Sequence, residues 1–261
     1  MKIKQITDAI ERFAPLRIQE SYDNSGLIVG SPEGEVSSAL IAVDITEEVM
    51  DEAEETGADM VISHHPIIFH PLKRLTDSDY VQRVVARALR GGIALYACHT
   101  NLDAVRGGLS YRVADMLGLR NIELLSVSEK DPEAGFGVVG EPDVPVKAEE
   151  FLLGMKKALD LRVVRHSDLC RDMVGRVAVC TGSGASLIDT ACRAGADIYI
   201  AADFKYNDFL DAAGRLTIAD IGHFESEYCA IDLLYDVITK NIPTFALRKS
   251  ARSRNPVNYL F

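Results

Sequence analysis

The feature that most constrains the fold is a repeated alternation of short apolar runs with amphipathic helical patterns. The apolar runs are built from Val, Ile, Leu and Ala, and helix-type periodicity follows them. The first series covers residues 39–45, 46–58, 59–63, 79–92 and 93–98. This rhythm is typical of βαβ units, so it predicts an α/β fold with much parallel sheet.

The same rhythm returns later in the chain, and the two series can be overlaid. Placing residues 54–65 over residues 192–203 aligns a Gly-Ala-Asp sequence that precedes a predicted strand in both. The stretch 126–145 is rich in Pro, Gly and acidic residues, which is typical of a boundary. We therefore predict two related α/β halves, residues 1–125 and 126–261. Convergence of short βα units is the alternative explanation.

Composition limits the class of protein. With 261 residues, of which 48% are hydrophobic and 26% charged, the chain is long enough for one large globular domain or two smaller ones. No apolar stretch approaches the ~18 residues of a membrane span, and the N-terminus lacks a signal-peptide core, so we expect a cytoplasmic protein. The five cysteines form no CxxC pair, so they suggest neither a disulfide framework nor a zinc knuckle. A net charge of −11 argues against nucleic-acid binding.

Histidines and carboxylates share a spacing at the ends of two predicted strands. A second, separate alignment of the strand ends that follow places His99 opposite His223 and Asp103 opposite Glu227, so each half carries His-x-x-x-carboxylate. Residues four apart lie on one face of a helix, so each pair can reach a single site. Histidine with carboxylate suits Zn, Mn, Fe or Ni better than Ca or Mg.

Two adjacent histidines end another predicted strand. In an extended strand His64 and His65 would point to opposite faces, but at a strand end each can take one of two neighbouring ions. A hydrogen-bonded structural histidine is the ordinary alternative. Five of the six histidines lie in or next to three strand-end segments, and only His166 lies elsewhere. We assign His70 to a surface loop and predict a dinuclear metal site.

Several segments together resemble the NIF-three-like family, the dinuclear-metal hexameric proteins often labelled GTP cyclohydrolase I type 2. They read SYDNSGLIVG, SHHPIIF, HTNLDA, GSG and GHFESE, in the family's order, and the resemblance covers nearly the whole chain. It implies the NIF-three-like fold, two halves facing a shared metal cleft, and a homohexamer. It also implies two divalent transition ions, with Glu227 bridging, on the ligands His64, His65, Asp103, His223 and Glu227.

This ligand set has consequences for the substrate. Two carboxylates cancel two of the four positive charges on two divalent ions, so a hydroxide and a small anionic substrate would complete the site. We take Lys205 as the candidate for meeting that anion, with a solvated surface lysine as the alternative. The overlay makes His99 a ligand, whereas the resemblance leaves it out. We follow the resemblance and expect His99 to be a proton shuttle or a donor beside the ions.

The chain departs from the family pattern at two places. Tyr22 stands where the family commonly has Trp, and residues 201–207 read AADFKYN where the family has Thr-Gly-Asp-x-Lys-Tyr-His. The predicted function is a metal-dependent hydrolase in which metal-bound hydroxide attacks a small anionic substrate, such as a nucleotide. The alternative is a non-catalytic metal-binding scaffold or interaction protein.

Overall fold

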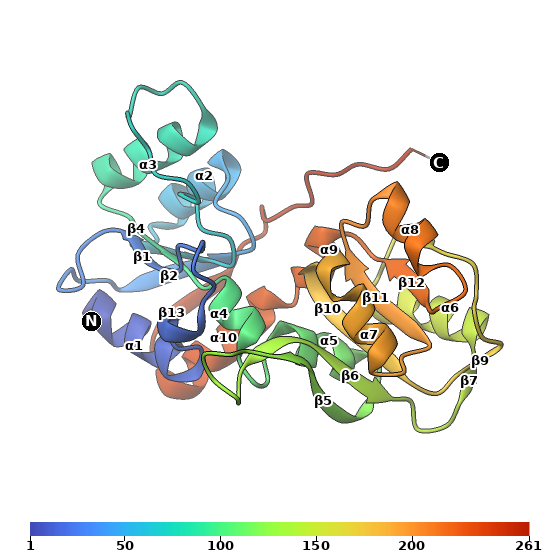
Figure 1. Cartoon of the computed structure of the whole chain (residues 1–261). Coiled ribbons are helices and arrows are strands. Elements are labelled where there is room, and N and C mark those ends of the chain that lie inside the picture. The colour runs from blue at the N-terminus through green and yellow to red at the C-terminus, as the bar shows by residue number, and fades with distance from the viewer. Residues whose placement is uncertain (261) are drawn as a thin grey trace. The chain divides into compact units, whose positions relative to one another are not determined.

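The computed structural model describes residues 1–260, and these divide into two compact units (Figure 1). Unit 1 comprises Met1–Val105 and Ala230–Pro256, and unit 2 comprises Arg106–Cys229 with the segment that follows Pro256. This division differs from the expected boundary in residues 126–145. That stretch lies within unit 2 and includes the turn of an antiparallel hairpin, so its Pro, Gly and acidic residues reverse the chain without ending a unit.

Unit 1 contains a five-stranded sheet. The strand order is β1-β4-β3-β2-β13, with every pair parallel except β1 and β4. The strands are β1 (Gly26–Val29), β2 (Ser38–Ala42), β3 (Met60–Ser63), β4 (Ala94–Ala97) and β13 (Ala246–Lys249). The helices are α1 (Ile3–Phe13), the 3-10 turn η1 (Leu16–Ile18), α2 (Glu47–Thr56), α3 (Tyr80–Gly91), α4 (Thr100–Ala104) and α10 (Ala230–Asn241).

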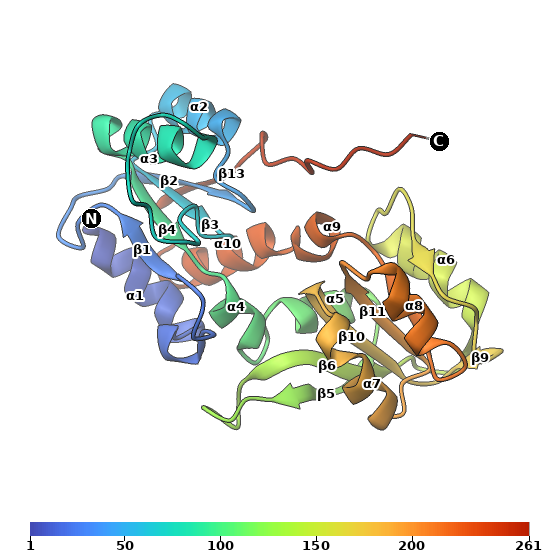
Figure 2. The same ribbon diagram turned by 45° about the horizontal axis from the view of Figure 1, so that its top comes forward.

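Helices cover both faces of this sheet, which is why its central strands are apolar except for a serine at one end of β2 and of β3. α2 and α3 pack over one face and α1 and α10 over the other (Figure 2). Local signals set the limits of α2. The Thr46 hydroxyl accepts a hydrogen bond from the Val49 N–H, and Gly57 ends the helix with φ of +66°.

Unit 2 contains a six-stranded sheet of order β5-β6-β10-β11-β12-β8 and a small antiparallel pair, β7 and β9. The strands are β5 (Arg120–Val127), β6 (Gly135–Glu141), β7 (Val146–Lys147), β8 (Arg165–His166), β9 (Met173–Val174), β10 (Val177–Ser183), β11 (Ile198–Ala202) and β12 (Thr217–Asp220). The helices are α5 (Leu109–Met116), α6 (Ala148–Ala158), the 3-10 turn η2 (Ala185–Leu187), α7 (Ile188–Arg193), α8 (Tyr206–Ala212) and α9 (His223–Glu227).

The α/β prediction is confirmed in both units, although their sheets differ. In unit 2, β10, β11 and β12 pair in parallel, whereas β5, β6 and β8 join the sheet antiparallel. α7 and α8 pack on one face of these strands to form the core of the unit. Among the described residues, no helix combines the length and the apolar character needed to cross a membrane.

Parallel register brings the ends of neighbouring strands to one edge of each sheet. In unit 1, Ser63 of β3 is paired with Ala42 of β2 on one side and with Ala97 of β4 on the other. In unit 2, Ala201 of β11 is paired with Asp220 of β12. Within each unit, the residues that follow these strands therefore lie close together, and several of them are histidines or acids.

The central strand of unit 1 gives a test of this packing. Ile62 in β3 is fully buried, so Ile62→Ala should lower the free energy of unfolding by roughly 2 to 5 kcal/mol, because it removes apolar contacts and leaves a cavity. Leu89 in α3 is 57% exposed, so Leu89→Ala should change the free energy of unfolding by less than about 0.5 kcal/mol. Urea unfolding of both variants checks this, and equal losses would contradict it.

Candidate metal centre

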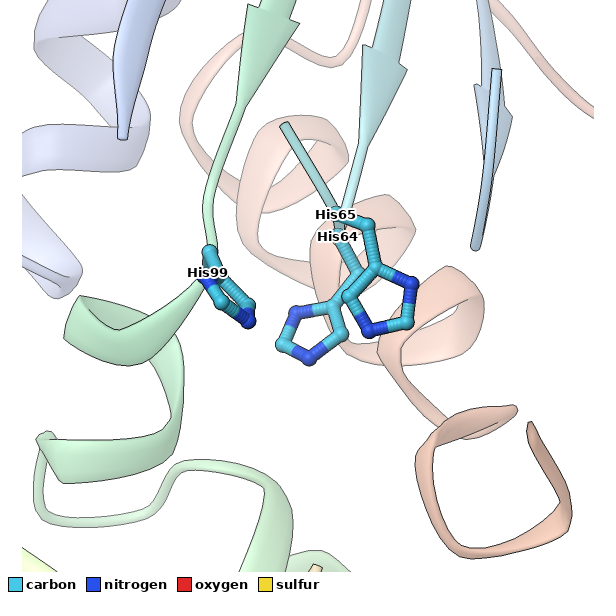
Figure 3. A group of neighbouring side chains, drawn as sticks. All are labelled: His64, His65 and His99. Carbon is cyan, nitrogen blue, oxygen red and sulfur yellow. The ribbon is translucent and has the colours of Figure 1, made fainter. Parts of the chain in front are cut away.

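The two adjacent histidines lie directly after β3 (Figure 3). β3 ends at Ser63, and the chain bends there, so His64 and His65 do not continue the strand alternation. Their ring centroids are 4.9 Å apart. Both rings therefore lie at one edge of the sheet, His64 fully buried and His65 with 24% of its side chain exposed.

Each of these rings has one nitrogen held by an oxygen of the protein. His64 Nδ1 donates to the backbone oxygen of Cys98 at 2.9 Å, and His65 Nδ1 lies 2.8 Å from Asp44 Oδ1. Such hydrogen bonds orient a histidine and leave Nε2 to face a ligand, which is the usual arrangement around metal-binding histidines. His64 Nε2 lies 3.9 Å from Asp103 Oδ1, which brings a carboxylate from α4 to the same place.

His99 completes a group of three histidines. It follows β4, and one nitrogen of each of the three rings lies within 4.8 Å of the others (Figure 3). His99 Nδ1 is 2.7 Å from Asp23 Oδ1. Burial alone would raise the pKa of Asp23, but hydrogen bonds from His99 and Thr100 outweigh this and hold it well below its ordinary value.

Unit 2 carries the second histidine and carboxylate pair on α9. His223 Nε2 lies 3.0 Å from Glu227 Oε2, and His223 Nδ1 lies 2.7 Å from Asp203 Oδ2. The hydrogen bond to Glu227 is the main reason that the pKa of His223 rises to about 9, with a further contribution from Asp203. As the helical spacing predicted, the two side chains of α9 contact each other.

The glycine of the GSG segment leaves room for this pair. Gly182 has φ of +66°, and a Cβ atom there would overlap Glu227 Oε1. Its N–H donates to Ser226 Oγ at 2.8 Å, which ties β10 to α9. The segment is a strand-to-helix turn, since β10 is followed by η2 and α7. A residue with a side chain here would have to displace the Glu227 carboxylate and adopt a backbone conformation that favours glycine.

The other singled-out residues lie on the surface. Lys205 is exposed at the start of α8, two residues after Asp203, and its backbone N–H donates to Asp208 Oδ2 at 2.6 Å. His70 is exposed in the loop after β3, as expected, and His166 lies in the edge strand β8.

Three acids hold histidines although the sequence did not predict this role for them, namely Asp23, which precedes β1, and two acids that follow parallel strands. Asp44 lies two residues after β2, and Asp203 lies immediately after β11. β2 pairs in parallel with β3, the strand that precedes His65. β11 pairs in parallel with β12, the strand that precedes His223. An acid just past the end of a buried parallel strand was therefore the available signal.

The His223 contacts predict a pH dependence. Because the pKa is raised in the folded protein, the contacts stabilise it fully below the unfolded pKa of about 6.5, and this stabilisation is lost as pH rises through about 9. Glu227→Gln should lower the His223 pKa toward 6.5. Glu225→Gln is the matched control, because the Glu225 side chain accepts from Tyr259. NMR titration of the metal-free protein measures both, and an unchanged pKa in Glu227→Gln would refute the assignment.

Comparison with known proteins identifies the family. The Duf34/NIF3 (NGG1p interacting factor 3) family model matches residues 1–256. A GTP cyclohydrolase 1 type 2 homolog of Clostridium perfringens is 34% identical over 87% of this chain and 87% of its own. One from Campylobacter jejuni is 34% identical over 99% of this chain and 100% of its own.

The fold agrees with the family match. The crystal structure of a hypothetical protein from Staphylococcus aureus superposes with a TM-score of 0.91 at 27% identity, covering 100% of this chain and 99% of that one. A Bacillus cereus protein related to NIF3 has the same fold, with a TM-score of 0.89 over 100% of this chain and 99% of its own, at 23% identity. The chain belongs to the Duf34/NIF3 family.

Proposed function

We propose that the protein is a metal-dependent hydrolase with a dinuclear centre. The observation that carries the proposal is the way in which hydrogen bonds orient the histidine rings. His64, His65 and His223 each have Nδ1 held by a carbonyl or carboxylate oxygen, so each presents Nε2. Histidines oriented in this way, with carboxylates beside them, are the donors that Zn, Fe, Mn and Ni prefer.

The proposed ligands are those that the family resemblance implies. His64, His65 and Asp103 come from unit 1, and His223 and Glu227 come from unit 2. When bound, two divalent ions would make water a nucleophile near neutral pH and attract an anionic substrate. The protein's own residues would hold these ions and position the substrate, with His99 moving a proton and Lys205 meeting a negative group.

The substrate class follows from charge and from the relatives. Two carboxylates among five ligands leave a positive site, which favours a small anion. The relatives named GTP cyclohydrolase 1 type 2 homolog make a nucleotide the first compound to test. The proposal includes a homohexamer, as the resemblance implies. It also includes a cytoplasmic location, as expected from a sequence without an apolar membrane span or a signal-peptide core.

A second function is favoured by the family's own description. NGG1p interacting factor 3 is named for an interaction with another protein. On this alternative, the ions stabilise a scaffold and no substrate is turned over. Screening the metal-loaded protein against nucleotides, phosphate monoesters and phosphodiesters separates the two functions. Turnover that is lost in the His64→Ala/His65→Ala double variant supports the hydrolase, and no turnover of any compound supports the scaffold.

Metal stoichiometry is the direct test of the centre. We expect up to two transition ions per chain, about 3 to 4 Å apart, because two-metal hydrolytic sites have this spacing. The His64→Ala/His65→Ala variant should lose bound metal, whereas His166→Ala should keep it, because His166 lies in β8. Elemental analysis and a crystal structure after soaking in Zn or Mn give the answer. A soaked crystal without an ion at His64 and His65 would refute the proposal.

The glycine beside Glu227 provides a second test. Gly182→Ala should weaken Zn²⁺ binding by roughly tenfold or more, because the new methyl group displaces the Glu227 carboxylate. Gly154→Ala is the matched control, since a Cβ there meets nothing within 4 Å and Gly154 lies inside α6. Calorimetric titration with Zn²⁺ compares the two variants. Equal affinities would show that Glu227 does not need the space that Gly182 leaves.

A further inference from the structure

The contact between His99 and Asp23 differs from the other histidine contacts in its surroundings. Three histidines have Nδ1 beside a carboxylate, namely His65 with Asp44, His223 with Asp203, and His99 with Asp23. The side chains of Asp44 and Asp203 are 41% and 50% exposed, whereas that of Asp23 is 0% exposed. A fully buried carboxylate is costly unless hydrogen bonds satisfy it.

Five hydrogen bonds satisfy this carboxylate. Asp23 Oδ1 accepts from the Asn24 N–H at 2.7 Å and lies 2.7 Å from His99 Nδ1. Asp23 Oδ2 accepts from the Ser25 hydroxyl at 2.9 Å, and from the Thr100 N–H and hydroxyl at 3.0 and 2.5 Å. So many donors favour the ionised form, which can only accept hydrogen bonds.

The two hydroxyl groups have no alternative role in this network. Ser25 Oγ accepts from the His99 N–H at 3.1 Å, and Thr100 Oγ1 accepts from the Glu20 N–H at 2.9 Å. Each hydroxyl oxygen therefore receives a backbone proton and gives its own proton to Asp23. Asp23 Oδ2 therefore accepts three protons, and because an ionised carboxylate can only accept, His99 Nδ1 is the donor to Oδ1.

From this geometry we infer that Asp23 is a positioning residue that holds His99 as its Nδ1–H tautomer, with Nε2 as the proton-accepting atom beside His64 and His65. The His99 ring centroid lies 5.3 Å from that of His64 and 5.4 Å from that of His65 (Figure 3). Neutral imidazole with a protonated Nδ1 has its lone pair on Nε2. The proton-moving role of His99 rests on the proposed function, whereas its tautomer does not.

Asp23→Asn should reverse the tautomer of His99, because Asn has nearly the same size and shape as Asp. The three donors of Ser25 and Thr100 at Oδ2 require the amide oxygen there, so the amide NH₂ replaces Oδ1 and donates to His99 Nδ1. The exposed Asn24 N–H, which Oδ1 accepts from in the wild type, then turns to water. His99 then carries its proton on Nε2. In serine proteases the same change beside the catalytic histidine leaves the geometry intact and lowers turnover by about 10⁴, because the tautomer is wrong.

NMR of the metal-free protein with ¹⁵N-labelled histidine tests the tautomer directly. His99→Gln identifies the His99 signals. We expect a protonated Nδ1 in the wild type and a protonated Nε2 in Asp23→Asn, a switch that a purely structural role would not produce. A wild-type His99 protonated on Nε2 overturns the inference even if the variant fails to fold. A folded Asp23→Asn protein with the original tautomer overturns it as well.

Zn²⁺ titration separates a positioning role from support of a metal ligand. Asp44→Asn is the matched control, because Asp44 makes the same contact to a proposed ligand, His65. It should weaken Zn²⁺ binding by roughly 10- to 100-fold, whereas Asp23→Asn should stay within about threefold of the wild type. An equal loss in both variants makes His99 a ligand and refutes the inference. A wild type that binds no Zn²⁺ refutes the proposed function and leaves the tautomer result standing.

Discussion

Parallel pairing of buried strands is the constraint from which the candidate centre follows. β2, β3 and β4 of unit 1 are covered on both faces, so they consist mainly of apolar residues, and histidines and acids begin only after the strands end. Parallel register puts those ends at one edge of the sheet. Asp44, His64, His65 and His99 therefore lie together although up to 55 positions separate them in the chain.

Carboxylates and carbonyls at that edge determine what the histidines can do. A histidine side chain alone can rotate and can carry its proton on either nitrogen. The Cys98 carbonyl, Asp44 and Asp23 each fix one Nδ1, so the rings are oriented before any ligand arrives. The same principle recurs in unit 2, where Asp203 holds His223 from the end of a neighbouring parallel strand. Preorganised donors bind metal without first losing this freedom.

The three carboxylates differ in burial, and this separates two kinds of support. Asp44 and Asp203 are partly exposed, so water shares the task of solvating them. Asp23 depends on protein donors alone, which join the segment before β1 to the first turn of α4. Removing the Asp23 carboxylate therefore leaves buried donors without an acceptor, whereas water can replace part of what Asp44 and Asp203 provide.

The sequence by itself determined the α/β class, because strand and helix periods are local and repeat clearly, and it determined the family, because several segments occur in a specific order. Strand-end positions and helical spacing also indicated a metal site at His64, His65, His99, Asp103, His223 and Glu227, because both patterns can be seen in the sequence. The family resemblance left His99 out of the proposed ligands. The unit boundaries were decided only by tertiary structure. α10 and β13 return to unit 1 because β13 pairs with β2, a contact between residues about 200 positions apart. The hydrogen bonds of Asp23, Asp44 and Asp203 were likewise decided in three dimensions, because strand pairing, which local sequence does not specify, sets which acid faces which histidine.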